Sequence, residues 1–498
     1  MLKQEFIQNI KKLLPDEYNA FEASLDTGPP VSIRINPWKS AAGNSFNSGN
    51  QTGNDPVAGD KVWKDIRPDA NAFSDMEKVP WCETGYYLPE RPFFTFDPLF
   101  HAGTYYVQEA SSMFLEQAMH KITEGLAGKQ ITALDLCAAP GGKSTHLLAL
   151  LPENSLLVSN EVIRSRSMIL AENIVKWGRP DNIVTHNDPK AFGKLTHFFD
   201  IILTDLPCSG EGMFRKDPAS RDEWSTDNIK LCASRQRRII RDVWEALKPG
   251  GYLIYSTCTF NTEENENNVR ILAEELGAGI IPVPVKEEWN ITGALRHNIP
   301  AYRFFPHRTR GEGFFLALMR KNDNVTDTNA IKAKPKNNKQ PLTIPAQIKQ
   351  MLLKPEKFIF RTRPDATGRD PKVSGKQAGT VYAIPAIHED RYAILSERLN
   401  IISAGILLGE FKGKDFLPSV SLALSTEINT HAFPTVELPY DQAIAYLQRE
   451  TVTMPEDTPK GYILVTYKGA PLGFVKNIGN RANNLYPQEW RIRSRKNP

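Results

Sequence analysis

Residues 199–210 have the sequence Phe-Asp-Ile-Ile-Leu-Thr-Asp-Leu-Pro-Cys-Ser-Gly. The apolar run at 199–203 predicts a buried strand, and this strand leads into an acid, Asp205, and a thiol, Cys208. In an open α/β sheet ligands bind at the carboxyl ends of the strands, so we expect both side chains to face a pocket. A second predicted strand, at residues 251–256, leads into Cys258. Two predicted strands that are each followed closely by a cysteine indicate a reaction site.

The region around these two strands alternates between strand and helix patterns from about residue 101 to 320. The expected strands are 133–137, 156–160, 183–186, 201–204, 252–256 and 314–319. The expected helices are 108–119, 143–150, 165–177, 230–247 and 263–275. This alternation is typical of a parallel sheet with helical crossovers, and it predicts an α/β fold.

The flanking segments predict a different organisation. Residues 1–100 suggest a small N-terminal α+β region, with a helix at 6–14 and a strand at 31–36. Residues 321–342 are rich in Lys, Asn and Thr and predict a linker. We expect a connecting region at 343–400 and a β-rich module at 401–498, which includes strands within 410–424 and a hairpin formed by 462–467 and 472–476.

Bulk properties narrow the class of protein. The chain has 498 residues and a formal net charge of +4, and no apolar run approaches the roughly 20 residues of a membrane span. The N-terminus lacks the apolar core of a signal peptide, so we expect a cytoplasmic protein. Its five cysteines include no Cys-x-x-Cys pair, which argues against disulfides and against a metal site. Basic clusters at 235–241, 303–310 and 491–496 suit phosphate contacts, although for each cluster a solvated helix face or tail is an equal alternative.

Residues 134–145, LDLCAAPGGKST, lead from the first strand through a glycine-containing turn into a helix. This is the general arrangement of a nucleotide-binding loop, but the spacing matches neither the dinucleotide fingerprint nor the P-loop. The first three strands end in or beside Asp135, Glu161 and Asp188. Acids at three strand ends without a phosphate cradle favour S-adenosylmethionine, which has a ribose and a base but no phosphate.

Three motifs resemble those of the RNA cytosine-5 methyltransferases of the Sun type: LDLCAAPGGKST at 134–145, TDLPCSGEG at 204–212 and YSTCT at 255–259. Residues 31–36 and 106–112 also match that family's pattern, so the resemblance covers roughly residues 30–320. Residues 461–475 and 480–493 are similar to the PUA-like RNA-binding module of the RsmF branch, in a weaker match. The resemblance implies a Rossmann-like methyltransferase core that uses S-adenosyl-L-methionine, followed by a C-terminal PUA-like domain.

By this resemblance Cys258 is the nucleophile that adds to carbon-6 of cytosine, which makes carbon-5 able to accept a methyl group. Cys208 assists product release, and Asp205 contacts the N3 side of the base. Lys143 is expected near Asp205 and the base, or else as an ordinary residue of the first helical turn. The implied cofactor-binding residues are Cys137, Ala138, Ala139, Pro140, Gly141, Gly142, Lys143, Glu161, Arg166, Asp188 and Asp205, and no metal is implied.

Several alternatives stay open on sequence grounds. A DNA-type enzyme would use Cys208 as the nucleophile, an assignment that the Ser-Thr-Cys-Thr motif around Cys258 disfavours. A non-catalytic RNA-binding ribosome-assembly factor would keep the basic clusters yet have no need of the two thiols. The resemblance favours small-subunit 16S rRNA as substrate, naked or within the assembled subunit, with tRNA as the alternative. We expect a monomer that binds RNA and no membrane.

Overall fold

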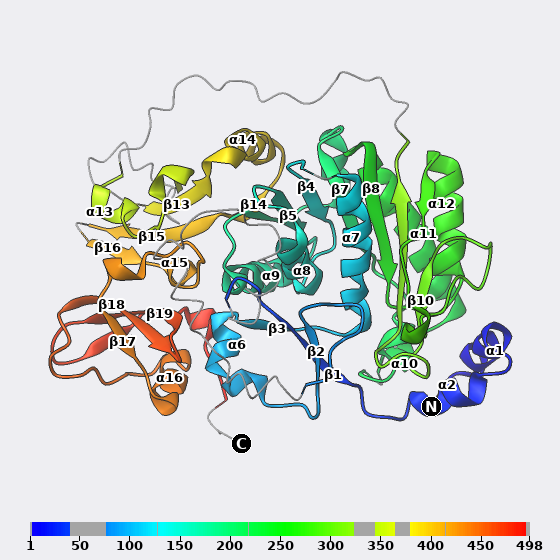
Figure 1. Ribbon diagram of the computed structural model, residues 1–498, viewed down its shortest axis with the longest axis horizontal. Helices are drawn as coiled ribbons and strands as arrows, with labels where there is room; N and C mark the ends of the chain where they lie inside the picture. The colour runs from blue at the N-terminus through cyan, green and yellow to red at the C-terminus, as the bar shows by residue number, and fades with distance from the viewer. Residues whose placement is uncertain are drawn as a thin grey trace.

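The computed structural model describes residues 2–39, 76–126, 128–217, 219–322, 344–363, 379–413 and 415–494. The strands of these residues form four sheets, with three, nine, four and four strands. Figure 1 shows most of the largest sheet in the half that contains the N-terminus and the last two sheets in the other half. Most of the linker expected at 321–342 lies outside the described residues, as does the sequence from 40 to 75.

The central sheet has the strand order β10-β11-β8-β7-β4-β5-β6-β14, with β9 paired to β11. Its five parallel strands are β4 (Thr132–Asp135), β5 (Leu156–Asn160), β6 (Asn182–Thr185), β7 (Phe199–Asp205) and β8 (Leu247–Thr257). Its antiparallel strands are β9 (Gly279–Ile281), β10 (Tyr302–Phe304), β11 (Phe314–Arg320) and β14 (Ile401–Ala404). The order reverses between β4 and β7, which is where open α/β sheets form their binding crevice.

Helices cover both faces of this sheet because its strands are apolar on both sides. One face packs against α7 (Leu115–Gly125), α8 (Gly142–Leu150) and α9 (Arg164–Trp177). The other face packs against α11 (Thr226–Trp244), α12 (Asn268–Leu276) and α14 (Glu389–Arg398). Successive residues of β7 alternate between the two cores: Ile201 belongs to the first and Ile202 to the second. The α/β, Rossmann-like core predicted from the sequence is confirmed.

Short helical turns connect these elements. They are η3 (Ser111–Phe114), η4 (Pro189–Lys194), η5 (Glu211–Met213), α10 (Ser220–Glu223), η6 (Glu263–Asn267) and η7 (Glu287–Trp289). Two predicted helices begin as turns of another kind, and the first of them also starts later than expected. The helix expected at 108–119 begins only at residue 111 as a 3-10 turn, because Gln108 still pairs with the strand region of Ser32. The helix expected at 263–275 begins as the π-turn η6, with a kink at Asn265.

The N-terminal unit combines α1 (Gln4–Leu13), α2 (Tyr18–Ser24) and a three-stranded antiparallel sheet. The strands are β1 (Val31–Ile35), β2 (Gly85–Leu88) and β3 (Tyr105–Val107), with β1 in the middle. The turn η2 (Phe94–Phe96) and the helix α6 (Pro98–Ala102) lie between β2 and β3. Because β3 pairs with β1, this unit extends past residue 100, where the sequence analysis placed its boundary.

The connecting region and the start of the C-terminal module form one sheet, β12-β13-β15-β16. Its strands are β12 (Phe358–Arg363), β13 (Gly379–Pro385), β15 (Ile406–Lys412) and β16 (Asp415–Pro418), so they come from both sides of residue 400. Helical segments α13 (Ala346–Lys349), η8 (Pro355–Lys357), η9 (Ala386–His388) and α15 (Val420–Ala423) accompany it. The end of β15 and the whole of β16 lie in the part of 410–424 that precedes residue 419, and the rest of that segment contains the helix α15, which Ser419 caps.

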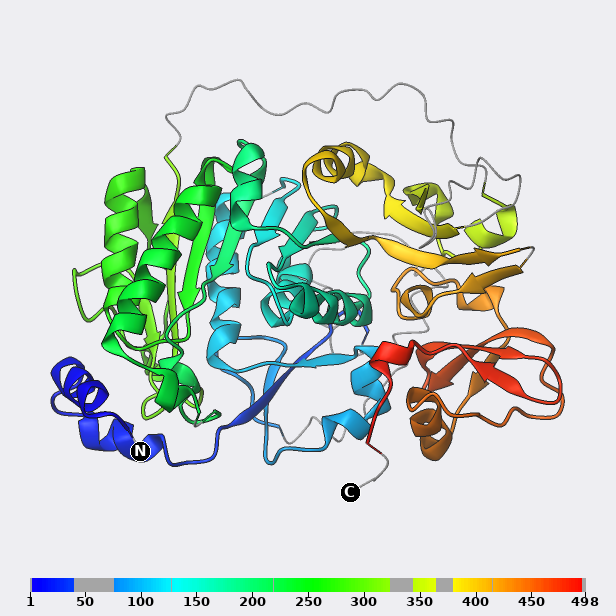
Figure 2. The ribbon, with the colours of Figure 1, turned by 180° about the vertical axis from the view of Figure 1, so that it is seen from behind.

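The last sheet, β17-β18-β19-β20, forms the C-terminal module. Its elements are η10 (Thr430–Ala432), β17 (Thr435–Glu437), α16 (Tyr440–Leu447), β18 (Gly461–Tyr467), β19 (Ala470–Asn477), β20 (Ala482–Asn484) and η11 (Gln488–Trp490). Its core is continuous with that of the N-terminal unit, and α6 lies against α16 and β19. Figure 2 shows the C-terminal end of the chain, in red, beside α6. The Tyr440 hydroxyl donates to the Phe96 carbonyl at 3.0 Å, in the contact between the C-terminal module and the N-terminal unit.

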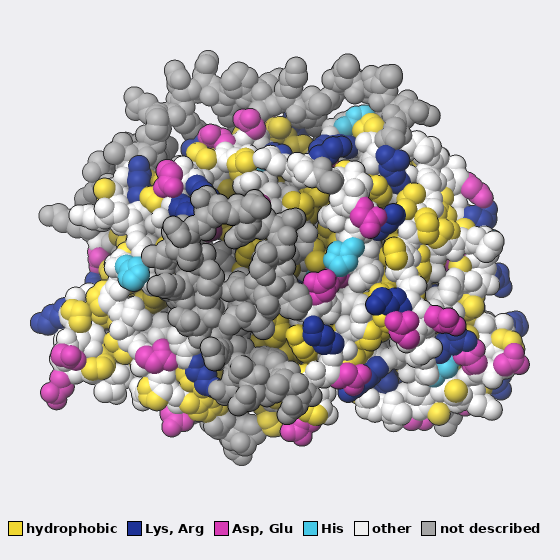
Figure 3. All heavy atoms as spheres, in the orientation of Figure 1, with side chains coloured by type: hydrophobic (Ala, Val, Ile, Leu, Met, Phe, Trp, Pro, Cys, Tyr) yellow, Lys and Arg dark blue, Asp and Glu magenta, His cyan; other side chains and the backbone are white. Residues whose placement is uncertain are grey.

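The surface carries both signs of charge. On the face shown in Figure 3, basic and acidic side chains are interspersed over the described residues, as expected from the small net charge. None of the described helices is long and apolar enough to span a membrane.

Candidate active site

The loop between β4 and α8 forms one wall of a cavity at the carboxyl end of the central sheet. Gly141 precedes α8 with φ of 118°, a conformation that a residue with a Cβ rarely adopts. A Cβ on Gly142 would lie 3.3 Å from the Tyr106 ring, so the glycine permits a close approach of the segment after β3. The expected Gly-Gly turn therefore sets both the start of α8 and the width of the cavity.

The cavity has a volume of about 200 Å³. It is lined by seven of the predicted cofactor-binding residues: Cys137, Ala138, Ala139, Pro140, Gly142, Lys143 and Asp205. Its other wall consists of Tyr106, Val107, Gln108, Glu109 and Ser112, which were not predicted. Asp135 at the end of β4, one of the acids expected from the sequence, also lines the cavity. The only signal for this wall in the sequence was the family-like pattern at 106–112, to which no role was given.

Asp135 places a buried carboxyl group in this cavity. Ser144 donates a hydrogen bond to its Oδ2 at 2.7 Å, whereas its Oδ1 has no hydrogen-bond partner among the described residues. Burial raises the pKa of Asp135 to about 7. A buried acceptor without a partner is costly, so this oxygen is suited to bind an N–H or O–H group of a ligand.

The acids expected at the next two strand ends differ in their surroundings. Glu161 is buried, accepts the backbone N–H of Ile163 at 2.9 Å, and lies 3.6 Å from the Arg166 guanidinium. Arg166 also donates to the Ala139 carbonyl at 2.8 Å, which ties the second strand end to the cofactor loop. Asp188 is exposed, and its side chain caps η4 by accepting the N–H of Lys190. Neither Glu161, Arg166 nor Asp188 is among the lining residues of the cavity.

Asp205 and Lys143 form an ion pair at the mouth of the same cavity. The Lys143 ammonium lies 2.8 Å from Asp205 Oδ2, and the Ser256 hydroxyl donates to Oδ1 at 3.0 Å. Burial opposes the charge on Lys143, but the Asp205 carboxylate outweighs it, so the pKa of Lys143 is raised. Because β7 and β8 are adjacent parallel strands, Asp205 is in register with Ser256 and hence close to the end of β8.

The two cysteines predicted as a reaction site are brought together. Their Sγ atoms lie 3.1 Å apart, and both side chains are partly exposed. Cys208 follows β7 and Cys258 follows β8. The hydrogen bond between Cys208 and Cys258, together with burial, raises the pKa of the Cys208 thiol.

Two buried glutamates hold the loops that carry the thiols, and sequence analysis missed both. Glu264 accepts the backbone N–H of Ser209 at 3.0 Å and the side-chain amides of Gln236 at 2.8 Å and Asn261 at 2.7 Å. Glu211 accepts the backbone N–H groups of Phe260 and Asn261, at 2.7 and 2.8 Å. Glu211, in the loop after Cys208, thus binds the segment after Cys258. Glu264, in the segment after Cys258, binds the loop after Cys208.

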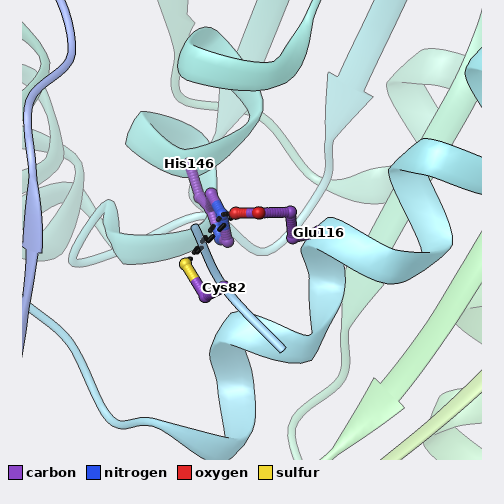
Figure 4. A group of neighbouring side chains, drawn as sticks. All are labelled: Cys82, Glu116 and His146. Carbon is purple, nitrogen blue, oxygen red and sulfur yellow. Dashed lines mark hydrogen bonds and ion pairs between the residues drawn. The ribbon is translucent and has the colours of Figure 1, made fainter. Parts of the chain in front are cut away.

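A second polar network joins the N-terminal unit to the cofactor loop. Figure 4 shows Cys82, Glu116 and His146 pointing toward one another. The Cys82 thiol donates to Glu116 Oε2 at 3.1 Å, and His146 Nε2 lies 3.0 Å from the same oxygen. Burial raises the pKa of Cys82 and lowers that of His146 to about 4. These residue types and distances would also suit a metal ion, but a neutral thiol and a neutral imidazole already satisfy the carboxylate.

Arg34 of β1 makes the other connection to the cofactor loop. It is fully buried and donates to Gln108 Oε1 at 2.9 Å and to Thr145 Oγ1 at 2.5 Å. Its guanidinium also stacks on Trp177, 4.5 Å from the ring centroid. By contrast Arg303, from one of the basic clusters, is buried against Glu266 and cannot contact an RNA phosphate.

The chain matches three family models. Residues 127–320 match 16S rRNA methyltransferase RsmB/F, residues 433–492 match the PUA domain of methyltransferase RsmF, and residues 60–110 match the N-terminal domain of 16S rRNA methyltransferase RsmF.

Curated relatives are similar over their full length. The ribosomal RNA small subunit methyltransferase F of Aliivibrio fischeri strain MJ11 is 33% identical, over 98% of this chain and 97% of that protein. The protein of the same description from Shewanella loihica is 30% identical, over 98% of this chain and 95% of that protein. Among solved structures, a methyltransferase homologue from Pyrococcus horikoshii is 25% identical with a TM-score of 0.51, over 64% of this chain and 95% of that chain.

Proposed function

Because this chain belongs to the RsmF family of 16S rRNA methyltransferases, we propose that it methylates carbon-5 of a cytosine in 16S rRNA. The methyl donor is S-adenosyl-L-methionine, which would supply an electrophilic methyl group at the cavity beside Asp205. The observation that carries the proposal is the pair of thiols at the ends of β7 and β8, 3.1 Å apart. Methyl transfer to an oxygen or nitrogen needs no such pair, whereas carbon-5 of cytosine becomes nucleophilic only after a thiolate has added to carbon-6.

The residues of the cavity fit the donor. The unpartnered Oδ1 of Asp135 can accept a hydrogen bond from its amino group or a ribose hydroxyl. Glu161, held beside the cofactor loop by Arg166, is the second buried acid at this edge. Small residues at 138–142 let a ligand approach the backbone, and α8 begins in the same loop, where its first N–H groups have no partner within the helix.

The chain's own groups account for the proton movements. Cys258 Sγ forms a bond to carbon-6, and the thiol proton ends on N3 of the ring. The Asp205 carboxylate, fixed by Lys143 and Ser256, stabilises the protonated N3 by a charge-assisted hydrogen bond. After methyl transfer Cys208, next to Cys258, releases its own proton to solvent and takes the proton from carbon-5 as the carbon–sulfur bond breaks. The proton on N3 then returns to the released Cys258 sulfur.

RNA is the partner that the PUA module of this family implies. We propose that the enzyme acts as a monomer in the cytoplasm and that its substrate is the small-subunit rRNA rather than tRNA. Labelling of naked 16S rRNA and of assembled small subunits, each in turn, distinguishes between these two forms of the substrate.

The test is transfer of a labelled methyl group from S-adenosylmethionine to naked 16S rRNA, assembled small subunits and tRNA. We expect label in 16S rRNA, in one or both forms, and its location at a 5-methylcytosine by bisulfite sequencing. Cys258→Ala should abolish transfer, and Cys208→Ala should leave the protein covalently attached to RNA. Cys232→Ala is the control, because that thiol is buried in α11. Label in tRNA alone would refute 16S rRNA as the substrate. A Cys208→Ala enzyme that turns over without an adduct would refute the roles given to the two cysteines.

A further inference from the structure

The two sulfurs at the ends of β7 and β8 are close enough for a reaction that methyl transfer does not use. Cys208 Sγ and Cys258 Sγ lie 3.1 Å apart. A disulfide has about 2.05 Å between its sulfurs, so an approach of about 1 Å would join them. All five cysteines lie within the described residues, and no other two of them have their sulfur atoms in contact.

The backbone that carries the two residues already has the spacing of a disulfide. Cys208 follows β7 and Cys258 follows β8, and these strands are parallel neighbours with Asp205 opposite Ser256. Neighbouring strands lie about 4.8 Å apart, and a disulfide needs about 4.4–6.8 Å between its Cα atoms. Rotation of the two side chains can therefore bring the sulfurs together while the strands stay paired.

Contacts beside the thiols keep the two loops together. The hydroxyl oxygens of Ser209 and Thr259, the residues that follow the two cysteines, lie 3.0 Å apart. The Gly212 N–H donates to the Cys258 carbonyl at 2.8 Å, and two buried glutamates bind the same loops. Because the loops are held in this way, little conformational freedom remains to be lost when the sulfurs join, and the effective concentration of one thiol at the other is high.

The two thiols differ in their electrostatic surroundings. The Lys143 ammonium attracts negative charge on the Cys258 sulfur. The hydrogen bond with Cys258, burial and the nearby Glu264 carboxylate all raise the pKa of Cys208. The thiolate is the form that an oxidant attacks, and both side chains are partly exposed, so that a small oxidant can reach them. Cys258 is therefore the sulfur that is oxidised first, and Cys208 is the one that reacts with the oxidised product.

We propose that Cys208 and Cys258 form a reversible intramolecular disulfide when the protein meets a hydroperoxide, and that this bond stops methyl transfer. The bond occupies both sulfurs, so neither can add to a cytosine nor take up a proton from it. The effect on methyl transfer rests on the proposed function, whereas formation of the bond does not.

Hydrogen peroxide is the one further reactant. The Cys258 thiolate attacks an oxygen of the peroxide, the O–O bond breaks, and the hydroxide that leaves becomes water with the proton that the thiol had lost. The Cys208 sulfur then attacks the sulfenic acid at Cys258, and a second water leaves as the S–S bond forms. The two sulfurs together lose two electrons, which the peroxide accepts.

The disulfide also preserves the nucleophile. A sulfenic acid that finds no thiol is open to further oxidation to a sulfinic acid, which dithiothreitol does not reverse. Because Cys208 is already in contact with Cys258, formation of the disulfide competes with that second oxidation. A return to reducing conditions then restores both thiols.

Alkylation counting tests the bond without any measurement of methylation. The full-length protein is treated with hydrogen peroxide, denatured and alkylated. The wild type should fall from five alkylated cysteines to three, because two are in the bond, with a peptide pair that links 208 and 258. Dithiothreitol should restore all five. Cys232→Ser is the matched control: it removes a thiol buried in α11, and it should show the same link.

The Cys208→Ser variant tests the protective role. It should form no intramolecular link, and dithiothreitol should recover less Cys258 thiol from it than from the wild type after the same exposure. Five alkylated cysteines in the treated wild type, a link from Cys258 to Cys137 instead, or equal recovery of Cys258 thiol in Cys208→Ser would overturn the proposal.

Methyl transfer to 16S rRNA gives the second readout. It should fall in proportion to the linked fraction and return to its starting rate after dithiothreitol. Linked protein that still methylates at the untreated rate would overturn the effect on methyl transfer. Untreated wild type that methylates no RNA would instead refute the proposed function and this effect with it, while the alkylation counts would still decide whether the bond forms.

Discussion

Substitution of Glu264 by glutamine should misplace both thiols while it leaves the fold intact. The carboxylate is fully buried and accepts from Ser209, Gln236 and Asn261. A glutamine keeps the shape but replaces one oxygen by an NH₂ group, which would face a donor whichever way it is turned. Hydrogen bonds to a buried charged group contribute roughly 1.5–3 kcal/mol each, so loss of one or two predicts a destabilisation of about 1.5–6 kcal/mol.

The same change should lower the rate of methyl transfer. Ser209 follows Cys208 directly, so a weakened hold on its N–H lets the sulfur move relative to Cys258. A displacement of about 1 Å in an active site costs about 100-fold in rate. We expect kcat to fall by about that factor, with little change in the affinity for S-adenosylmethionine, because Glu264 does not line the cofactor cavity.

Urea unfolding and steady-state kinetics measure the two effects, and Glu263→Gln is the matched control. Glu263 is the preceding residue, but it is exposed, and it accepts only from Asn267. Its loss should change stability by less than about 0.5 kcal/mol. If the Glu264→Gln enzyme unfolded at the same urea concentration as this control and turned over at the wild-type rate, the carboxylate would have no part in positioning the thiols.

Three further predictions concern the cofactor loop and its supports. Lys143→Met removes the partner of Asp205 and should reduce kcat by at least about 100-fold, measured by label transfer at saturating RNA; unchanged kcat would exclude a role for the ion pair. Because burial lowers the pKa of His146 to about 4, the folded protein binds fewer protons there than the unfolded chain between about pH 4 and 6.5. Stability from this group should therefore be complete above pH 6.5 and fall by about 3 kcal/mol toward pH 4, and His146→Gln should flatten that dependence in urea titrations. Finally, a Cβ at Gly212 would meet backbone oxygens at 2.7 and 2.8 Å, so Gly212→Ala should lower the melting temperature. Gly293→Ala, with open space around it, should not, and equal melting temperatures would contradict the packing.

Local sequence patterns located the parallel strands because each is a short apolar run that ends in polar residues. The predicted strand at 156–160 coincides with β5, and the strand at 201–204 lies within β7. The thiol pair was predictable for the same reason: neighbouring parallel strands end at one edge, so residues just beyond them meet. The family-like motifs added the assignment of roles, which geometry alone does not supply.

Contacts between distant segments could not be predicted from the sequence. β14 pairs with β6 across more than 200 residues, and nothing in the short sequence Ile-Ile-Ser-Ala specifies that partner. Arg34 gave no sign of burial, because an isolated arginine in an alternating strand is normally on the solvent face. The roles of Glu211 and Glu264 likewise depend on how two loops meet, and a glutamate in a loop is in most proteins simply exposed.

These buried acids lie where burial of a charge is unfavourable for the stability of the fold. Burying a carboxylate or guanidinium is unfavourable unless it is fully paired, and a well-packed apolar group is often as stable or more so. Yet Glu211, Glu264 and the Glu266–Arg303 pair are all buried within the few residues that follow the two cysteines or pack on them. Apolar side chains could fill this space, but they could not bind the backbone N–H groups that orient the loops. The polar interior here therefore fixes the direction of two sulfurs, and we expect substitutions in it to reduce catalysis more than their effect on stability alone would predict.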